Sequence, residues 1–192
     1  MAVRMELSRI LIRELTEYQL IELREVAPAT DHDGGDALEP GTSGSLAKPQ
    51  FSQVEGGRSF PIVIGLPEAH AIERRLKGIQ IKRPQTHDLL ANAITALGGT
   101  LESICINDLT EHTYFAVLNV RTGDGKIVQI DARPSDAIAL GIAGNVPILV
   151  EEHVLEAARK SAEAEAVDKA DDDDDDDDED DEDDDEEEGK SP

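Results

Sequence analysis

The chain has 192 residues and a formal net charge of −25. A net charge of this sign argues against a protein whose whole surface attracts the nucleic-acid backbone. The charge is concentrated in one segment, because every residue from Asp171 to Glu188 is Asp or Glu; the rest carries 25 acids against 18 Lys and Arg, about −7. A single cysteine, Cys105, excludes an internal disulfide and a zinc site of several cysteines; its apolar surroundings predict a buried, inert thiol. With no Trp and few aromatic residues, the core of such a domain must be aliphatic.

The N-terminal part of the chain alternates polar and apolar residues with a period of two. Residues 4–15 and 16–26 carry this pattern, which predicts a β-hairpin. Residues 27–57 are rich in Pro, Gly, Ser, Thr and Asp, so we predict a flexible insertion there. The segment "RSFPIVIG" then predicts a strand, with Pro61 at a sheet edge or a strand start because proline cannot donate to a ladder.

Helical and β-rich segments alternate irregularly in the rest of the chain. "LPEAHAIERRLKG" predicts an amphipathic helix with Pro67 in its first turn and Gly78 at its end, and "RPQTHDLLANAITALGG" a second helix with Thr86 as its N-cap. Strands are predicted for "TLESICINDL", "TYFAVLNV" and "KIVQIDA", the last two joined by a Gly-rich turn. A third helix ("PSDAIALGIAGN"), a short strand ("VPILV") and a fourth helix ("EEHVLEAARKSAEAEAV") complete the order.

This order predicts an α+β fold, a β-rich sheet with about four helices in a single compact domain. We expect the domain to span residues 1–160, with the insertion at 27–57, and residues 161–192 to be a disordered polyacidic tail, because like charges repel. The tail can serve solubility, bind basic proteins, collect divalent cations or compete with a nucleic acid. No membrane span or secretory signal is visible, so a soluble cytoplasmic protein is expected.

Two similar motifs, "RPQTHD" and "RPSDAI", place an arginine, a proline, a hydroxyl and an acid at a helix start. In a structural interpretation the hydroxyls and acids accept free backbone N–H groups of the first turn. The residues that would do so are Thr86, Asp88, Ser135 and Asp136. This leaves Arg83 and Arg133 unexplained, and each precedes a helix N-terminus, where phosphate-type anions bind.

In a functional interpretation, acids from separate segments come together to hold Mg²⁺ or Mn²⁺, which would polarise a phosphodiester and activate water. The acids concerned are Glu68, Asp88, Asp131 and Asp136. His87, beside Asp88, is a candidate for acid–base catalysis with that acid as its orienting partner. Both interpretations of the motifs stay open from the residues alone.

The most cationic segment, "ERRLKGIQIKRPQ", leads directly into the first motif. It contains Arg74, Arg75, Lys77, Lys82 and Arg83. Such a segment is typical of a solvated helix face and loop, and it is also a place where an anionic substrate can approach an otherwise acidic domain.

Three motifs in order, "FPIVIGLPEAHAIERRLKG", "RPQTHDLL" and "DARPSDAIALGI", resemble the bifunctional nuclease domain family of bacteria, archaea and plants. The resemblance runs from about Met5 to Leu155, interrupted by the insertion. It implies a compact α+β domain, often self-associating, and nuclease activity on RNA and DNA, which is attributed to some plant members. The insertion and the polyacidic tail depart from the family, and the additional C-terminal module of plant members is not seen.

The resemblance carries over these residues: Glu68, Arg83, Pro84, Thr86, His87, Asp88, Asp131, and the run from Arg133 to Asp136. We therefore predict a nuclease acting on RNA or single-stranded DNA, with Mg²⁺ or Mn²⁺ as a candidate cofactor and a homo-oligomer as a candidate state. The catalytic candidates are Asp88, Asp131, Asp136 and His87; substrate-binding candidates are Arg83, Arg133, Ser135 and Thr86; metal-ligand candidates are Glu68, Asp131 and Asp136. The alternative is a non-enzymatic module that binds an anion or a protein, with the acidic tail recruiting basic partners.

Overall fold

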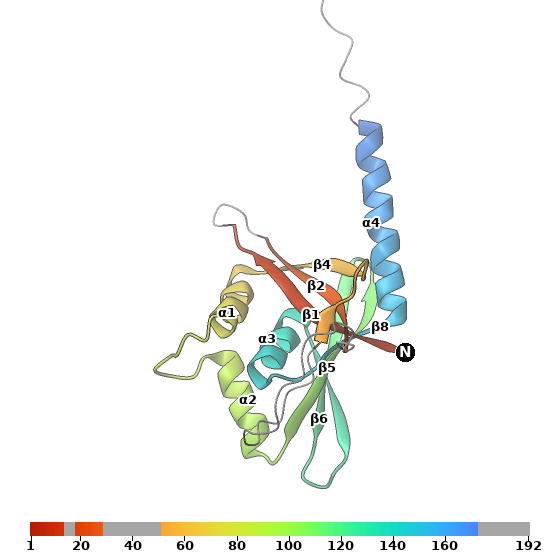
Figure 1. Ribbon diagram of the computed structural model, residues 1–192. Coiled ribbons are helices and arrows are strands. Elements are labelled where there is room, and N and C mark those ends of the chain that lie inside the picture. Colours follow the sequence, from red (N-terminus) through yellow and green to blue (C-terminus); the bar gives the residue numbers. More distant parts are fainter. Residues whose placement is uncertain (14–17, 29–50, 173–192) are drawn as a thin grey trace, which may run out of the picture. The chain divides into compact units, whose positions relative to one another are not determined.

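The structure is a computed structural model that describes residues 1–13, 18–28 and 51–172. It divides into two compact units, Met1–Ala158 and Arg159–Pro192. The first unit contains a sheet of eight strands in the order β3-β2-β1-β8-β5-β6-β7, with β4 paired to β2 as well (Figure 1). Helices and this mixed sheet make the fold α+β, as predicted. Within the described ranges, no helix is both long and apolar enough to cross a membrane.

The N-terminal hairpin is confirmed. Strands β1 (Ala2–Leu11) and β2 (Gln19–Pro28) pair antiparallel, with Leu7 opposite Leu23. Strand β4 (Ser59–Ile64) pairs with β2 alone, so Pro61 lies on an edge strand, where its missing N–H breaks no ladder.

The predicted insertion is shorter than expected at both ends. Pro28 still belongs to β2, and Phe51–Gln53 forms the short strand β3, which pairs with it. The guanidinium of Arg4 lies 3.7 Å from the centre of the Phe51 ring, so an aromatic contact fixes the place where β3 begins. Residues 54–57 of the predicted insertion form a turn before β4, and residues 29–50 lie outside the described residues.

The C-terminal half adds an antiparallel meander of β5 (Thr100–Thr110), β6 (Thr113–Arg121) and β7 (Ile127–Ala132). Strand β8 (Ile148–Glu151) runs parallel to β5 and antiparallel to β1, and so joins the two halves into one sheet. This pairing leaves β7 at one end of the sheet.

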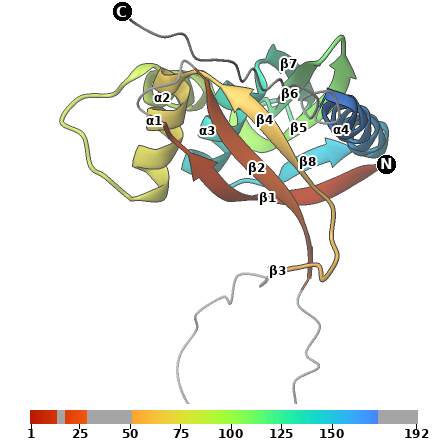
Figure 2. The ribbon, with the colours of Figure 1, turned by 90° about the horizontal axis from the view of Figure 1, so that it is seen from above.

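Three helices gather beside the sheet in both views (Figures 1 and 2): α1 (Leu66–Leu76), α2 (Thr86–Ala96) and α3 (Pro134–Gly144). Helix α3 packs against β5 and β6, and both α1 and α2 pack against α3. A Cβ atom at Gly141 would lie 3.3 Å from Cγ1 of Ile104, so a glycine there lets α3 approach the sheet closely.

Helix α4 (Glu152–Asp172) begins in the first unit and continues further than the predicted start of the tail at residue 161. The segment is rich in Ala, Glu and Lys, which favour helix, and Arg159 pairs with Glu163 one turn later at 3.2 Å. The fourth predicted helix is therefore confirmed, and it continues past Val167 into residues predicted to belong to the tail. Residues 173–192, with most of the acidic run, lie outside the described residues.

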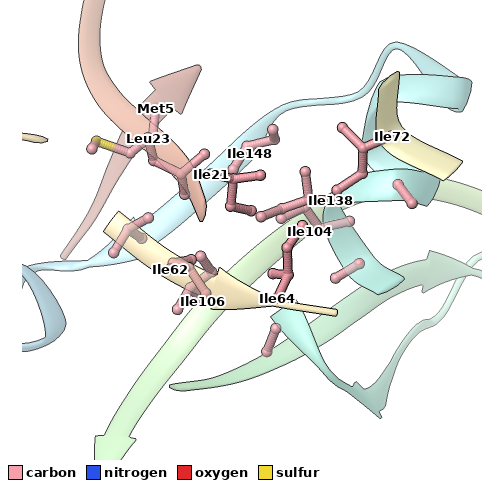
Figure 3. Packing of buried hydrophobic residues seen from close by; sticks show 14 of the residues in the cluster. Met5, Ile21, Leu23, Ile62, Ile64, Ile72, Ile104, Ile106, Ile138 and Ile148 are labelled. Atoms are coloured by element: carbon pink, nitrogen blue, oxygen red, sulfur yellow. The ribbon is translucent and has the colours of Figure 1, made fainter. Parts of the chain in front are cut away.

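The core is aliphatic, as the composition predicts. Isoleucines from the strands meet Ile72 of α1 and Ile138 of α3 (Figure 3). Phe60 and Tyr114 add a stacked ring pair with centroids 5.4 Å apart. Cys105 is buried, and burial raises the pKa of its thiol to about 11, which makes it unreactive at neutral pH.

Candidate functional site

Three helices begin with an acid at their third helical position: Glu68 in α1, Asp88 in α2 and Asp136 in α3. A carboxylate in the first turn interacts favourably with the free N–H groups and the positive end of the helix dipole. The three carboxylates nevertheless have different partners, and these differences define the site.

In α2 the acid caps its own helix. The N-cap residue is Gln85, not Thr86 as predicted, because Gln85 is extended, with φ −89° and ψ −179°, and Thr86 is already helical. Oδ2 of Asp88 accepts the backbone N–H of Gln85 at 3.0 Å, and the Gln85 side chain accepts the backbone N–H of Asp88. This is a capping box, so the structural interpretation of the "RPQTHD" motif is correct for Asp88.

In α3 the predicted caps are wrong. The N-cap residue is Arg133, whose side chain makes no cap hydrogen bond, and Ser135 is buried rather than presented at the surface. The carboxylate of Asp136 is occupied by two other side chains, those of Arg133 and His87. The two Arg-Pro motifs are therefore alike in sequence but differ in what they do.

We call Glu68, His87, Arg133 and Asp136 the Arg133 cluster. Nη2 of Arg133 donates to Oε1 of Glu68 at 2.7 Å, and its Nε donates to Oδ2 of Asp136 at 2.8 Å. Nε2 of His87 lies 2.8 Å from Oδ1 of Asp136. Because Glu68, His87 and Asp136 stand in the first turns of α1, α2 and α3, the N-termini of three helices meet at this cluster.

Within the cluster the side chains of Glu68 and His87 are half-buried, and that of Arg133 is exposed. The side chain of Arg133 is 66% exposed, whereas that of Glu68 is 15% exposed and that of His87 14%. Burial alone would raise the pKa of Asp136, but hydrogen bonds from Arg133 and His87 outweigh it and lower that pKa. Asp136 is therefore ionised at neutral pH, and it favours the His87 tautomer that carries its proton on Nε2.

Asp88 belongs to a second group of charges. Its Oδ2 accepts from Nη2 of Arg74 at 2.9 Å, and its Oδ1 accepts from Nη2 of Arg75 at 2.8 Å. Burial would raise the Asp88 pKa, but the Gln85 N–H and the two arginines lower it. The predicted pairing of His87 with Asp88 is thus wrong: side chains adjacent in a helix point in different directions, and the partner of His87 is Asp136.

Besides Asp88 and Ser135, three predicted site residues do not join the Arg133 cluster. Asp131 is exposed on β7, and Arg83 is exposed in the loop before α2. In the part of the chain that the structure describes, neither side chain has a hydrogen bond or ion pair to the cluster. Thr86 is exposed at the first position of α2, without a contact to it.

The carboxylates do not fit a divalent cation as they are arranged. Among residues 1–13, 18–28 and 51–172, no three side chains of His, Cys, Asp or Glu come together as metal ligands. Glu68 and Asp136 do converge, but on the guanidinium of Arg133, so a cation already occupies the position between them. Mg²⁺ requires about six oxygen ligands in octahedral geometry, and we therefore derive no chemical step through a metal.

Arg74 and Arg75 are the contacts that the sequence prediction missed. The cationic segment was expected to be a solvated face, yet the side chain of Arg75 is 6% exposed and that of Arg74 14%. The helical period could have predicted this burial. Arg75 follows Ala71 by four residues and Ile72 by three, so it lies on the face that α1 buries.

The comparison with protein families decides the assignment of this chain. The model of the bifunctional nuclease domain matches residues 51–163, which include the whole Arg133 cluster and Asp88 with its two arginines. The chain belongs to the bifunctional nuclease domain family. Strands β1 and β2 precede the matched segment.

Relatives within this family differ in how much is known of them. Two uncharacterized proteins of Mycobacterium tuberculosis, from strains CDC 1551 and H37Rv, are each 42% identical over 106 residues, which is 55% of this chain and 62% of their own length. Bifunctional nuclease 2 of Arabidopsis thaliana is 26% identical over 100 residues, 51% of this chain and 30% of that protein. The matched segment thus spans less than two thirds of each of these relatives.

Proposed function

We propose that this chain is a nuclease that cleaves phosphodiester bonds of RNA, DNA or both at the Arg133 cluster. Its family and the printed name of the Arabidopsis relative support this proposal. The observation that carries it is the His87–Asp136 pair, held beside an exposed arginine where three helix N-termini meet. Each of these features favours the binding or the cleavage of a phosphate ester.

Binding of the phosphate is assigned to Arg133 and the helix N-termini. Free backbone N–H groups and helix dipoles at N-termini attract anions. The guanidinium adds donors in a fork that matches phosphate oxygens, and its exposure leaves it within reach of a large substrate. Glu68 and Asp136 hold this guanidinium in place, and because their two charges exceed its one, phosphate binding is assigned to the helix N-termini and the exposed donors of Arg133 and not to net charge.

Proton transfer is assigned to His87. With its Nε2–H donated to Asp136, the imidazole retains Nδ1 to accept a proton from the attacking group. That group is the 2′-hydroxyl in RNA or a water molecule in either nucleic acid. As its oxygen bonds to phosphorus, the bond to the leaving oxygen breaks, and the leaving oxygen takes up a proton from the imidazolium, which returns His87 to its neutral form. Ionised Asp136 stabilises the imidazolium formed in the first step.

Degradation of labelled single-stranded RNA and DNA by the purified full chain tests this proposal. It is run with Mg²⁺, with Mn²⁺ and with a chelator, beside an Asp136→Asn variant whose folding is checked by circular dichroism. We expect cleavage that persists in the chelator and is lost in the folded variant. Loss of wild-type activity in the chelator would instead restore a divalent metal to the mechanism.

A non-enzymatic binding module is the second candidate, and one observation favours it. The three carboxylates at the helix starts are each paired with arginine, an arrangement that also occurs in purely structural ion-pair networks. Wild-type protein that binds labelled nucleic acid without cleaving it under all three conditions would favour this candidate.

We propose further that two copies associate through β7. This strand ends the sheet, and Ile127, Val128 and Ile130 are exposed on it. A long apolar edge strand invites pairing with another strand, and antiparallel pairing of β7 with itself gives a closed twofold dimer.

For the acidic tail, charge alone supports binding of basic proteins or divalent cations. A cytoplasmic location is proposed because the single thiol, Cys105, allows no internal disulfide.

A further inference from the structure

A cavity of about 300 Å³ lies between the end of α1, the start of α2 and the end of α3. Four charged or polar residues line it, Arg74, Arg75, Asp88 and Gln80, together with Gly78, Ile79, Ile81, Ile142 and Ala143, and most of the lining surface is polar. None of these residues belongs to the Arg133 cluster, so the cavity is a separate feature of the fold.

Positive charge is in excess at this cavity. Two guanidiniums share the single carboxylate of Asp88, which also accepts the backbone N–H of Gln85. Both arginine side chains are largely buried, so water screens the excess charge less than it would at the surface. Two arginines against one acid leave the site short of one negative charge.

Hydrogen-bond donors are also in excess. Nη1 of Arg75 and Nε of Arg74 are buried and have no hydrogen-bond partner among the described residues. An unpaired buried donor is costly, and more so when it is charged. Burial and the neighbouring Arg74 lower the pKa of Arg75, although Asp88 opposes this, in keeping with a guanidinium that is under-compensated. A ligand that brings negative charge into the cavity would compensate the excess positive charge of these two guanidiniums.

We infer that this cavity binds the phosphate group of a small phosphomonoester. Paired guanidiniums recognise phosphate oxygens through forked hydrogen bonds, and phosphate supplies the missing negative charge. A bare phosphate would leave much of the space unfilled, whereas Ile79, Ile81 and Ile142 offer apolar surface to an attached organic group. A mononucleotide has this combination of phosphate and planar body.

The inference is tested by titrating the full chain with inorganic phosphate and with 5′-AMP while NaCl keeps the ionic strength constant. Ligand that binds the folded state raises the melting temperature with concentration. We expect both ligands to raise it, with 5′-AMP effective at lower concentration than phosphate, and adenosine to have no effect. Equal effects of phosphate and AMP at the same concentration would show that only the phosphate group is bound, which would contradict a contact between the cavity and the attached organic group.

Variants in the same cationic segment locate the binding. Arg75→Met removes the guanidinium and is expected to weaken AMP binding at least about tenfold, from the loss of a charged hydrogen bond. Arg75→Lys keeps the charge without the fork and should bind with intermediate affinity even if the methionine variant folds poorly. Lys82→Gln removes an exposed cation that does not line the cavity, and it should bind like the wild type.

Two outcomes would overturn the inference. One is a melting temperature that responds to phosphate and AMP no more than to additional NaCl. The other is unchanged binding in both Arg75 variants. The inference does not depend on the proposed nuclease, because none of the residues that line the cavity belongs to the Arg133 cluster.

Discussion

At the scale of single residues, Asp136 is the side chain that contacts both His87 and Arg133. Both of its oxygens accept from Arg133, and one of them, Oδ1, also lies 2.8 Å from Nε2 of His87. Removing its charge should therefore affect both the orientation of the imidazole and the stability of the fold. The lowered pKa of Asp136 determines the pH range in which its charge stabilises the fold.

The first prediction concerns acid stability. The pKa of Asp136 is lower in the folded protein than its ordinary value of 3.8, so its stabilising contribution is complete above that value and is lost as pH falls through the folded pKa. Urea denaturation of the wild type and Asp136→Asn should give a difference in unfolding free energy that is constant above pH 5 and shrinks toward pH 2. A difference that is the same at all pH values would contradict this assignment.

The second prediction concerns Asp88. Asp88→Asn leaves two largely buried guanidiniums without their carboxylate, and breaking a buried pair in this way costs about 3 kcal/mol. Glu73→Gln is the matched control, because it breaks an exposed pair with Lys77 on α1 and should change the unfolding free energy by about 0.5 kcal/mol or less. Similar small losses in both variants, measured by denaturant titration, would show that the Asp88 pairs are not buried in solution.

At the scale of elements, the start of α1 is built around the Glu68 carboxylate. Gly65 is the N-cap residue of α1, and its φ of −76° is open to any residue, so glycine is required there by space and not by conformation. A Cβ atom at this position would overlap Oε2 of Glu68. The missing side chain lets the acid fold back toward the helix start while Oε1 holds Arg133.

The third prediction follows from this contact. Gly65→Ala should displace the Glu68 carboxylate and loosen Arg133, lowering cleavage severalfold while the melting temperature changes little, because the carboxylate is the free end of a side chain. Gly144→Ala at the end of α3 is the control, since the added Cβ meets only ordinary contacts there, the nearest being Val146 at 3.5 Å. Cleavage by Gly65→Ala equal to that of the control would remove Glu68 from the account.

Most elements could be predicted because their signals are local. Helices α1 and α2 end before Gly78 and Gly98, whose φ values of +63° and +79° are those that glycine adopts easily, and both ends were visible as glycines in the sequence. The β5–β6 turn, in contrast, has positive φ at Glu111 and His112, which are not among the residues that usually mark such a turn. Strand β3 was missed because only pairing with β2 and contact with Arg4 order a three-residue strand in polar sequence.

Four of the predicted site residues lie together in the structure, but their pairings were not predicted. Glu68, His87, Arg133 and Asp136 were all chosen, yet the partner of His87 is 49 residues away in the chain, and Asp88 next to it is not that partner. Arg133 to Glu68 spans 65 residues. Contacts of this kind depend on how helices pack on one another, which period and capping signals do not contain.

At the scale of the whole molecule, the exposed strand β7 leads to the fourth prediction. Sedimentation velocity of the wild type should show a dimer, and Ile130→Lys should shift it toward monomer, because a charge on an edge strand opposes pairing. Leu97→Lys, on an exposed residue at the end of α2, is the control and should leave the dimer intact. A wild type that is monomeric at high concentration would contradict the β7 interface.

The fifth prediction concerns the acidic run. Deleting residues 173–192 removes most of the negative charge of the chain, so nucleic acid should bind more tightly and at higher salt. Fluorescence anisotropy with labelled single-stranded RNA at several NaCl concentrations measures both effects. Identical affinity with and without the deleted residues would show that the run does not oppose nucleic-acid binding.

The most direct test of the central claim, that His87 moves the proton at the Arg133 cluster, is the initial rate of RNA cleavage in chelator by three proteins. These are the wild type, His87→Ala, and His70→Ala, which removes an exposed histidine from α1 outside the cluster. Loss of a general acid–base group lowers the rate by roughly 10²- to 10⁴-fold, so we predict a fall of that size for His87→Ala and none for His70→Ala. Equal rates in all three proteins would contradict the claim.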